Sequence, residues 1–179
     1  RTRKEENPII LNQKYFTDLG NSGIKIYLVS CNTEWAGDNS LELFDKEAKL
    51  IFEAVPDAYI IARFGLHPSP DWTRENPDEC EIYGDGTKTP VHVWSESKEL
   101  DLDGFYSPLS SVWRKDAGEK LTSAWKKVMA LPYADRIIGC MPTAGGTSEW
   151  YYIPPFFRAD KKTTLGHSKA FKREFSEYL

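Results

Sequence analysis

The fold is indicated first by a short run in the first half of the chain, Ala58-Tyr59-Ile60-Ile61-Ala62-Arg63-Phe64. The run is rich in β-branched and aromatic residues, so it predicts a strand. It is mostly apolar and does not alternate strictly with polar residues, as expected when helices cover a parallel sheet.

Similar runs on either side predict two more strands, over 24–29 and 136–141. Apolar residues at helical spacing predict helices between them, over 11–19, 39–55, 107–131 and 168–178. The expected helix ends are Gly20 as a C-terminal cap, Asn39 opening a capping box, Ser107 as an N-cap before Pro108, and Ser168 as the start of the last helix.

Helices and strands therefore alternate along the chain, which predicts an α/β fold of parallel strands joined by right-handed crossovers. We expect residues 1–179 to form a single unit of this kind. The connections that follow the strands are long, at about residues 31–39, 65–106 and 142–166, whereas such loops usually have ~2–6 residues. Because the carboxyl ends of parallel strands carry the functional site, this asymmetry predicts a binding or catalytic rim.

Composition excludes several classes of protein. The net charge of −4 argues against nucleic acid as the partner, and no apolar run approaches the ~20 residues of a membrane span. The three cysteines are far apart and the three histidines lack ligand spacing, so we expect no disulfide framework and no metal site. Phosphate-binding loops, dinucleotide-binding turns and nucleophile elbows are absent, and no cofactor is expected.

Each long connection places a carboxylate directly before a tryptophan: Glu34 before Trp35, Asp71 before Trp72, and Glu149 before Trp150. Sugars need this combination, because their C–H faces lie on aromatic rings while their hydroxyls need polar partners. Glu149 is the strongest candidate for catalysis, since packing against an indole is expected to raise the pKa of a carboxyl group toward that of a general acid. A surface glutamate or a helix cap is the alternative for Glu149.

Other residues of the three connections are candidate sugar contacts. Trp35, Trp72 and Trp150 would shape the subsites, and Asn32, Arg63 and His67 would contact hydroxyls. Glu34 would bind a hydroxyl or anchor its loop.

At this point the chain resembles a known family. The segment 70–79, with Pro70, Trp72 and the run Pro77-Asp78-Glu79, is similar to the segment after the third strand of β-galactosidase-like glycoside hydrolases with a (β/α)8 barrel. The stretch 137–150 resembles the fourth strand and its loop, which ends in a Gly-x-x-Glu-Trp-like motif, and 167–179 resembles the helix that follows.

The resemblance implies that the chain is a partial TIM barrel, the N-terminal half, with strands two to four of eight. Glu149 then takes the position of the general acid/base, and the family implies hydrolysis with retention of configuration. Ser148 stands where the family usually has an asparagine that contacts the sugar 2-hydroxyl, which puts that contact in doubt. The nucleophile would follow the seventh strand, which this chain does not include.

The expected partners are an oligosaccharide or glycoside and the remaining half of the barrel, supplied by C-terminal residues or by a second chain. A non-catalytic carbohydrate-binding or scaffold protein on the same half-barrel remains an alternative, as does a doubly wound α/β enzyme of other chemistry. The sequence does not identify the sugar or the compartment.

Overall fold

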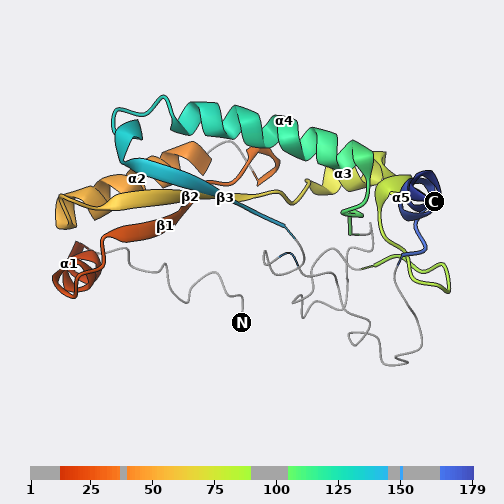
Figure 1. The fold of residues 1–179 in the computed structure, drawn as a ribbon, viewed down its shortest axis with the longest axis horizontal. Coiled ribbons are helices and arrows are strands. Elements are labelled where there is room, and N and C mark those ends of the chain that lie inside the picture. Colours follow the sequence, from red (N-terminus) through yellow and green to blue (C-terminus); the bar gives the residue numbers. More distant parts are fainter. Residues whose placement is uncertain (1–12, 37–39, 90–104, 145–149, 151–165) are drawn as a thin grey trace. The chain divides into compact units, whose positions relative to one another are not determined.

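The computed structural model describes residues 13–36, 40–89, 105–144, 150 and 166–179. These residues form a mixed α/β fold (Figure 1). The strands and the longer helices follow one another in the expected order, but a short helix over Pro70–Glu75 lies inside the connection 65–106, where the sequence predicts none. The strands are β1 (Ile26–Ser30), β2 (Tyr59–Gly65) and β3 (Ile137–Thr143). The α-helices are α1 (Gln13–Asn21), α2 (Ser40–Ala54), α3 (Pro70–Glu75), α4 (Ser111–Val128) and α5 (Lys169–Tyr178). Three 3-10 turns are η1 (Glu34–Ala36), η2 (Pro77–Glu79) and η3 (Ala134–Arg136).

The three strands form one parallel sheet with the sequential order β1-β2-β3. In the register of β1 and β2, Ile26 lies opposite Tyr59, Leu28 opposite Ile61, and Ser30 opposite Arg63. The predictions of parallel strands and of an α/β fold are therefore confirmed. No helix in the described part of the chain is long and apolar enough to cross a bilayer.

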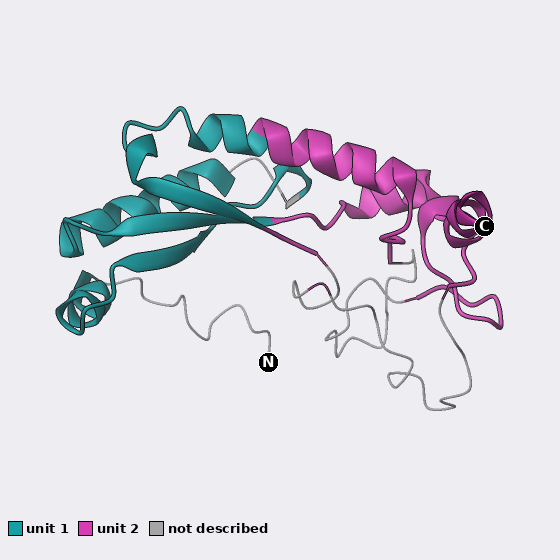
Figure 2. Cartoon of the chain, viewed as in Figure 1, with its two compact units in different colours: residues 1–64, 124–141 teal, residues 65–123, 142–179 magenta. Residues whose placement is uncertain are grey.

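The chain divides into two compact units (Figure 2). The first consists of residues 1–64 and 124–141 and contains most of the sheet. The second consists of residues 65–123 and 142–179 and contains α3, η2 and α5. The boundary falls within α4, within β3 and before the last residue of β2.

One face of the sheet in the first unit is buried under helices. Alternate strand residues point to this face and are fully or almost fully buried: Tyr27, Val29, Ile60, Ala62 and Phe64. The ring of Phe16 in α1 meets Tyr27 edge to face, and the indole of Trp125 in α4 meets Phe64 in the same way. The core of this unit lies between these helices and this face.

The opposite face of the same strands is apolar but exposed. Ile26 and Leu28 in β1 are 55% and 48% exposed, and Ile138 in β3 is 51% exposed. Tyr59 lies opposite Ile26 and is also exposed. The mostly apolar strands thus have two apolar faces, as their sequence indicates, but the described helices cover only one of them.

The end of α1 differs from the prediction. Gly20 lies inside the helix, which continues to Asn21, and the left-handed residue that ends it is Gly23, with φ of 89°. The amide of Ile24 closes the turn by donating to the carbonyl of Leu19 (3.1 Å). Gly20 is instead a contact residue, because a Cβ atom there would lie 2.6 Å from Cγ2 of Val55.

The start of α4 was predicted three residues too early. Ser107 is not its N-cap, because its amide donates to the carbonyl of Glu79 (2.8 Å) in an antiparallel pairing. A turn follows, closed by the amide of Ser110 donating to the carbonyl of Ser107 (3.0 Å). The Ser110 hydroxyl then accepts from the amide of Trp113 (2.9 Å) and caps the helix.

Helix α4 also ends earlier than predicted, at Val128 rather than near residue 131. The remaining helix boundaries that can be compared agree with the sequence. Helix α2 ends at Ala54, before Pro56. Ser168 caps α5, its hydroxyl accepting from the amide of Phe171 (3.0 Å). Asn39, the expected capping residue of α2, lies outside the described residues.

Candidate functional site

The exposed apolar face becomes polar at the carboxyl ends of its strands. Ser30 and Arg63 lie opposite each other there, on the same face as Leu28 and Ile61. Arg63 is half-buried, and its guanidinium makes no hydrogen bond or ion pair with another described residue. Burial raises the pKa of Glu47 in α2, and the positive charge of Arg63 partly offsets that rise. Arg63 is therefore a positively charged residue at the carboxyl ends of the strands, and its N–H donors make no hydrogen bond with the other described residues.

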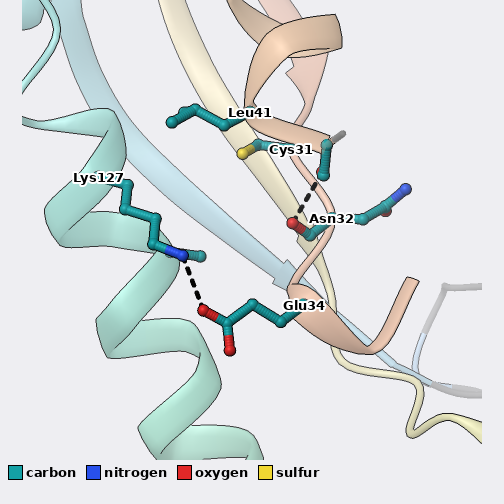
Figure 3. Close-up of a pocket in the computed structure, with 7 residues that line it drawn as sticks. Cys31, Asn32, Glu34, Leu41 and Lys127 are labelled. Atoms are coloured by element: carbon teal, nitrogen blue, oxygen red, sulfur yellow. Dashed lines mark hydrogen bonds and ion pairs between the residues drawn. The ribbon is translucent and has the colours of Figure 1, made fainter. Parts of the chain in front are cut away.

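A pocket of about 230 Å³ opens in the first unit at the carboxyl end of β1 (Figure 3). Its lining comes from the first long connection, the start of α2 and the end of α4: Cys31, Asn32, Glu34, Ser40, Leu41, Ala124 and Lys127. Cys31 continues the buried alternation of Tyr27 and Val29, so this pocket lies on the helix-covered side of the sheet. Arg63 and Ser30 point to the other side.

Two polar contacts fix the shape of the pocket. Lys127 forms an ion pair with Glu34, with 2.7 Å between Nζ and Oε1. The Ser40 hydroxyl donates to the carbonyl oxygen of Asn32 (2.8 Å), which holds the connection against the start of α2 (Figure 3). Glu34 and Asn32, both predicted sugar contacts, thus come together at one pocket, whereas Trp35 is half-buried in η1 beside them.

Cys31 is a protonated thiol rather than a nucleophile at neutral pH. Its pKa is raised chiefly by burial, and the Ser40 hydroxyl and the charge of Lys127 only partly offset this. All three cysteines are free, with Cys31 and Cys80 buried and Cys140 exposed. The pocket therefore has the features of a binding cavity and lacks an activated thiolate.

In the second unit, two residues predicted to contact sugar, His67 and Trp72, interact with other side chains. The His67 ring is half-buried and meets the edges of Phe105 and Tyr106. Trp72 is buried in α3, and its indole N–H donates to a carboxylate oxygen of Asp116 (2.8 Å). Because the faces of this indole are covered by protein, we assign Trp72 to the anchoring of α3.

Trp150 is different, since its side chain is 54% exposed. Its amide donates to the carbonyl of Ala144 (2.7 Å), and its indole N–H donates to the carbonyl of Pro142 (3.1 Å). Its φ of 62° lies in the left-handed region, and it is the one non-glycine residue in the described part with a positive φ. Glu149 and Ser148, the predicted acid/base and its neighbour, lie outside the described residues.

One ionic network in the second unit joins residues that are far apart in the sequence. Glu79 is buried and accepts two hydrogen bonds from Arg173 in α5 (3.0 and 2.9 Å). The Ser110 hydroxyl donates a third (2.6 Å). Asp78, the preceding residue, is exposed. No periodicity marks this network, because its members are 31 and 94 residues apart.

The arrangement of possible metal ligands and the similarity to known proteins both bear on function. Within the described residues, no three His, Cys, Asp or Glu side chains gather as a metal site. Comparison of the chain with models of known protein families, with curated proteins and with solved structures found no match. The assignment of function therefore depends on the short motifs of the sequence and on the geometry given above.

Proposed function

We propose that this chain is part of a (β/α)8 glycoside hydrolase, with Glu149 as general acid/base. In this mechanism the carboxyl group of Glu149 protonates the glycosidic oxygen as the bond breaks and later deprotonates the attacking water. Trp150 contacts the sugar through its ring face. The second carboxylate comes from outside residues 1–179.

The observation that carries the proposal is the conformation of Trp150. A bulky side chain with a positive φ costs roughly 1–3 kcal/mol, and such strained residues cluster at ligand sites. Here the strain holds a half-exposed indole at the end of β3, one residue after Glu149. Both hydrogen bonds of Trp150 with described residues use its N–H groups, which leaves the aromatic faces for a sugar.

The sheet supports the barrel part of the proposal. A barrel requires parallel strands in sequential order, helices on the outer face and an apolar inner face. The described sheet has the order β1-β2-β3, a helix-covered face and an exposed apolar face. We propose that further strands continue this sheet into a closed barrel, so that the second face becomes the barrel interior. One half of a doubly wound sheet has the same strand order, so the position of further strands separates the two folds.

Substitution of Glu149 by glutamine in the full-length protein tests the catalytic role. We expect a loss of at least ~10²-fold in kcat on ordinary glycosides, with partial recovery on aryl glycosides whose leaving groups need no protonation. Turnover close to that of the unmodified protein would exclude Glu149. Sugar binding by the unmodified protein without any hydrolysis would instead favour the second candidate, a carbohydrate-binding protein.

Trp150→Gly tests the binding role separately from folding. Glycine adopts a positive φ without strain, so the variant should fold at least as stably while its affinity for sugars falls roughly tenfold or more. Tyr178→Ala, which removes another exposed ring, is the matched control and should keep full affinity. Equal affinity of the glycine variant and the control would remove Trp150 from the site.

A further inference from the structure

The second unit contains a buried carboxylate that lacks a countercharge among the described residues. Glu81 is 1% exposed. Its Oε2 accepts a hydrogen bond from the amide of Gly166 (3.2 Å), whereas its Oε1 has no hydrogen-bond partner in the described part of the chain. Burial of an ionised carboxylate is costly unless a positive charge compensates it.

A second unsatisfied oxygen lies on the same side of the same strand pair. Ser107 is fully buried, and its hydroxyl has no partner among the described residues. The amide of Ser107 donates to Glu79 (2.8 Å) and that of Glu81 donates to Phe105 (2.6 Å), on either side of the antiparallel bridge between Cys80 and Tyr106. Alternation therefore places the side chains of Glu79, Glu81, Phe105 and Ser107 on one face.

Neither of two nearby cations pairs with Glu81. Arg173 neutralises Glu79, the other carboxylate of this face, through two hydrogen bonds. Lys88 is exposed and pairs with Ile82, which places it on the opposite face of the strand from Glu81. In the described part of the chain, the ion pair of Glu79 with Arg173 thus leaves Glu81 without a guanidinium partner. A water molecule could satisfy the two unpaired oxygens but would leave the charge of Glu81 uncompensated.

We propose that Glu81 and Ser107 are ligands of a buried hard cation, with Ca²⁺ as the probe. A carboxylate and a hydroxyl are oxygen donors of the kind that Ca²⁺ prefers, and main-chain carbonyls and water commonly complete its shell of about 6–8 ligands. Both proposed donors are oxygen atoms, whereas transition metals favour imidazole and thiolate ligands. The cation would stabilise the strand pair of the second unit and, through Glu81, the backbone at Gly166.

Thermal unfolding of the chain with and without Ca²⁺, after treatment with a chelator, tests the site. A Ca²⁺ concentration a few times its Kd should raise Tm by roughly 2–4 °C. The rise should be lost in Glu81→Gln and reduced in Ser107→Ala. Glu75→Gln, which alters an exposed carboxylate of α3, is the matched control and should respond like the unmodified chain. Equal concentrations of NaCl and MgCl₂ control for ionic strength and for cation selectivity.

Terbium luminescence provides a second measurement that does not depend on the stability of Glu81→Gln. Tyr83 lies on the same face as Glu81 by alternation, so excitation of tyrosine should sensitise a bound Tb³⁺ ion in the unmodified chain and less so in Ser107→Ala. No change in Tm and no sensitised emission with any cation would overturn the proposal. An equal rise in Tm for Glu81→Gln would also overturn it, since the cation would then bind elsewhere.

Discussion

At the scale of single residues, two glycines of the helices have opposite surroundings. Gly20 in α1 lies against Val55, so a side chain there would meet the Val55 methyl groups. Gly118 in α4 has nothing within 4 Å of the position that a Cβ atom would take. The same substitution should therefore have opposite effects, although both glycines lie inside helices.

We expect Gly20→Ala to lower the free energy of unfolding by about 1–3 kcal/mol, because the clash with Val55 outweighs the gain in helix propensity. Gly118→Ala should raise it by about 0.5–1 kcal/mol, since only the propensity changes. Urea unfolding followed by circular dichroism measures both. Destabilisation by both substitutions, or by neither, would contradict this description of α1.

The cysteines provide another prediction at this scale. Cys140 should react with a thiol reagent in the folded chain much faster than Cys31 and Cys80, because it alone of the three is exposed. Burial also raises the pKa of Cys31, so its reactive thiolate is scarce at neutral pH. Timed labelling should show one fast thiol, and Cys140→Ser should abolish that phase. Fast labelling of two or more thiols in the native chain would show that the buried sites open.

At the scale of elements, helix α5 is held to η2 by charge. The Arg173 hydrogen bonds keep the pKa of Glu79 below its usual range despite burial. In the same helix Glu174 has a pKa of about 2, lowered first by a hydrogen bond with Ser111 and then by Arg114 and Arg173. Both carboxylates bind protons more weakly in the folded than in the unfolded chain. Their contribution to stability is therefore complete above the unfolded pKa of about 4.3 and is lost as pH falls through the folded values.

Glu79→Gln should lower the free energy of unfolding at pH 7 by about 1–3 kcal/mol, because Arg173 loses its charge partner while the shape of the site is kept. The free energy of unfolding of the unmodified chain should fall from pH 5 toward pH 3, and that of the variant should fall less. Denaturant unfolding across this pH range measures both effects. Asp78→Asn, which alters the exposed pair of Asp78 with Lys169, is the control and should cost less than about 1 kcal/mol. Identical pH profiles for Glu79→Gln and the unmodified chain would contradict the proposed linkage.

At the scale of the whole molecule, the exposed apolar face of the sheet is the main feature that indicates a binding partner. An apolar surface of this kind on a folded chain is typical of an interface. The proposed barrel supplies the partner as further parallel strands. For residues 1–179 alone, the same face should cause self-association and should bind hydrophobic dyes.

The double substitution Leu28→Thr and Ile138→Thr should reduce dye fluorescence and self-association, with little change in stability, because both side chains are exposed and threonine keeps the strand propensity. Val29→Thr, one residue along β1, is the control on the buried face. It should lower the free energy of unfolding by about 1–3 kcal/mol, since it buries a hydroxyl in the core. If sedimentation showed unchanged self-association of the double variant, this face would not be the surface through which the chain associates. In the proposed barrel the double substitution should lower the free energy of unfolding, because this face would be buried.

Local periodicity and caps such as Ser168 predict the order of the strands and longer helices, the parallel strands and most of the helix boundaries, but not the short helix α3. The sequence also reveals the three long connections and the Glu149-Trp150 motif. The contacts between distant residues are visible only in the folded chain. The tertiary structure moved the start of α4 to Ser111, since Ser107 pairs with Glu79, and it buried Trp72 against Asp116. It also showed that one apolar face of the sheet is covered and the other is not. Such features depend on packing between residues far apart in the chain, which no local pattern records.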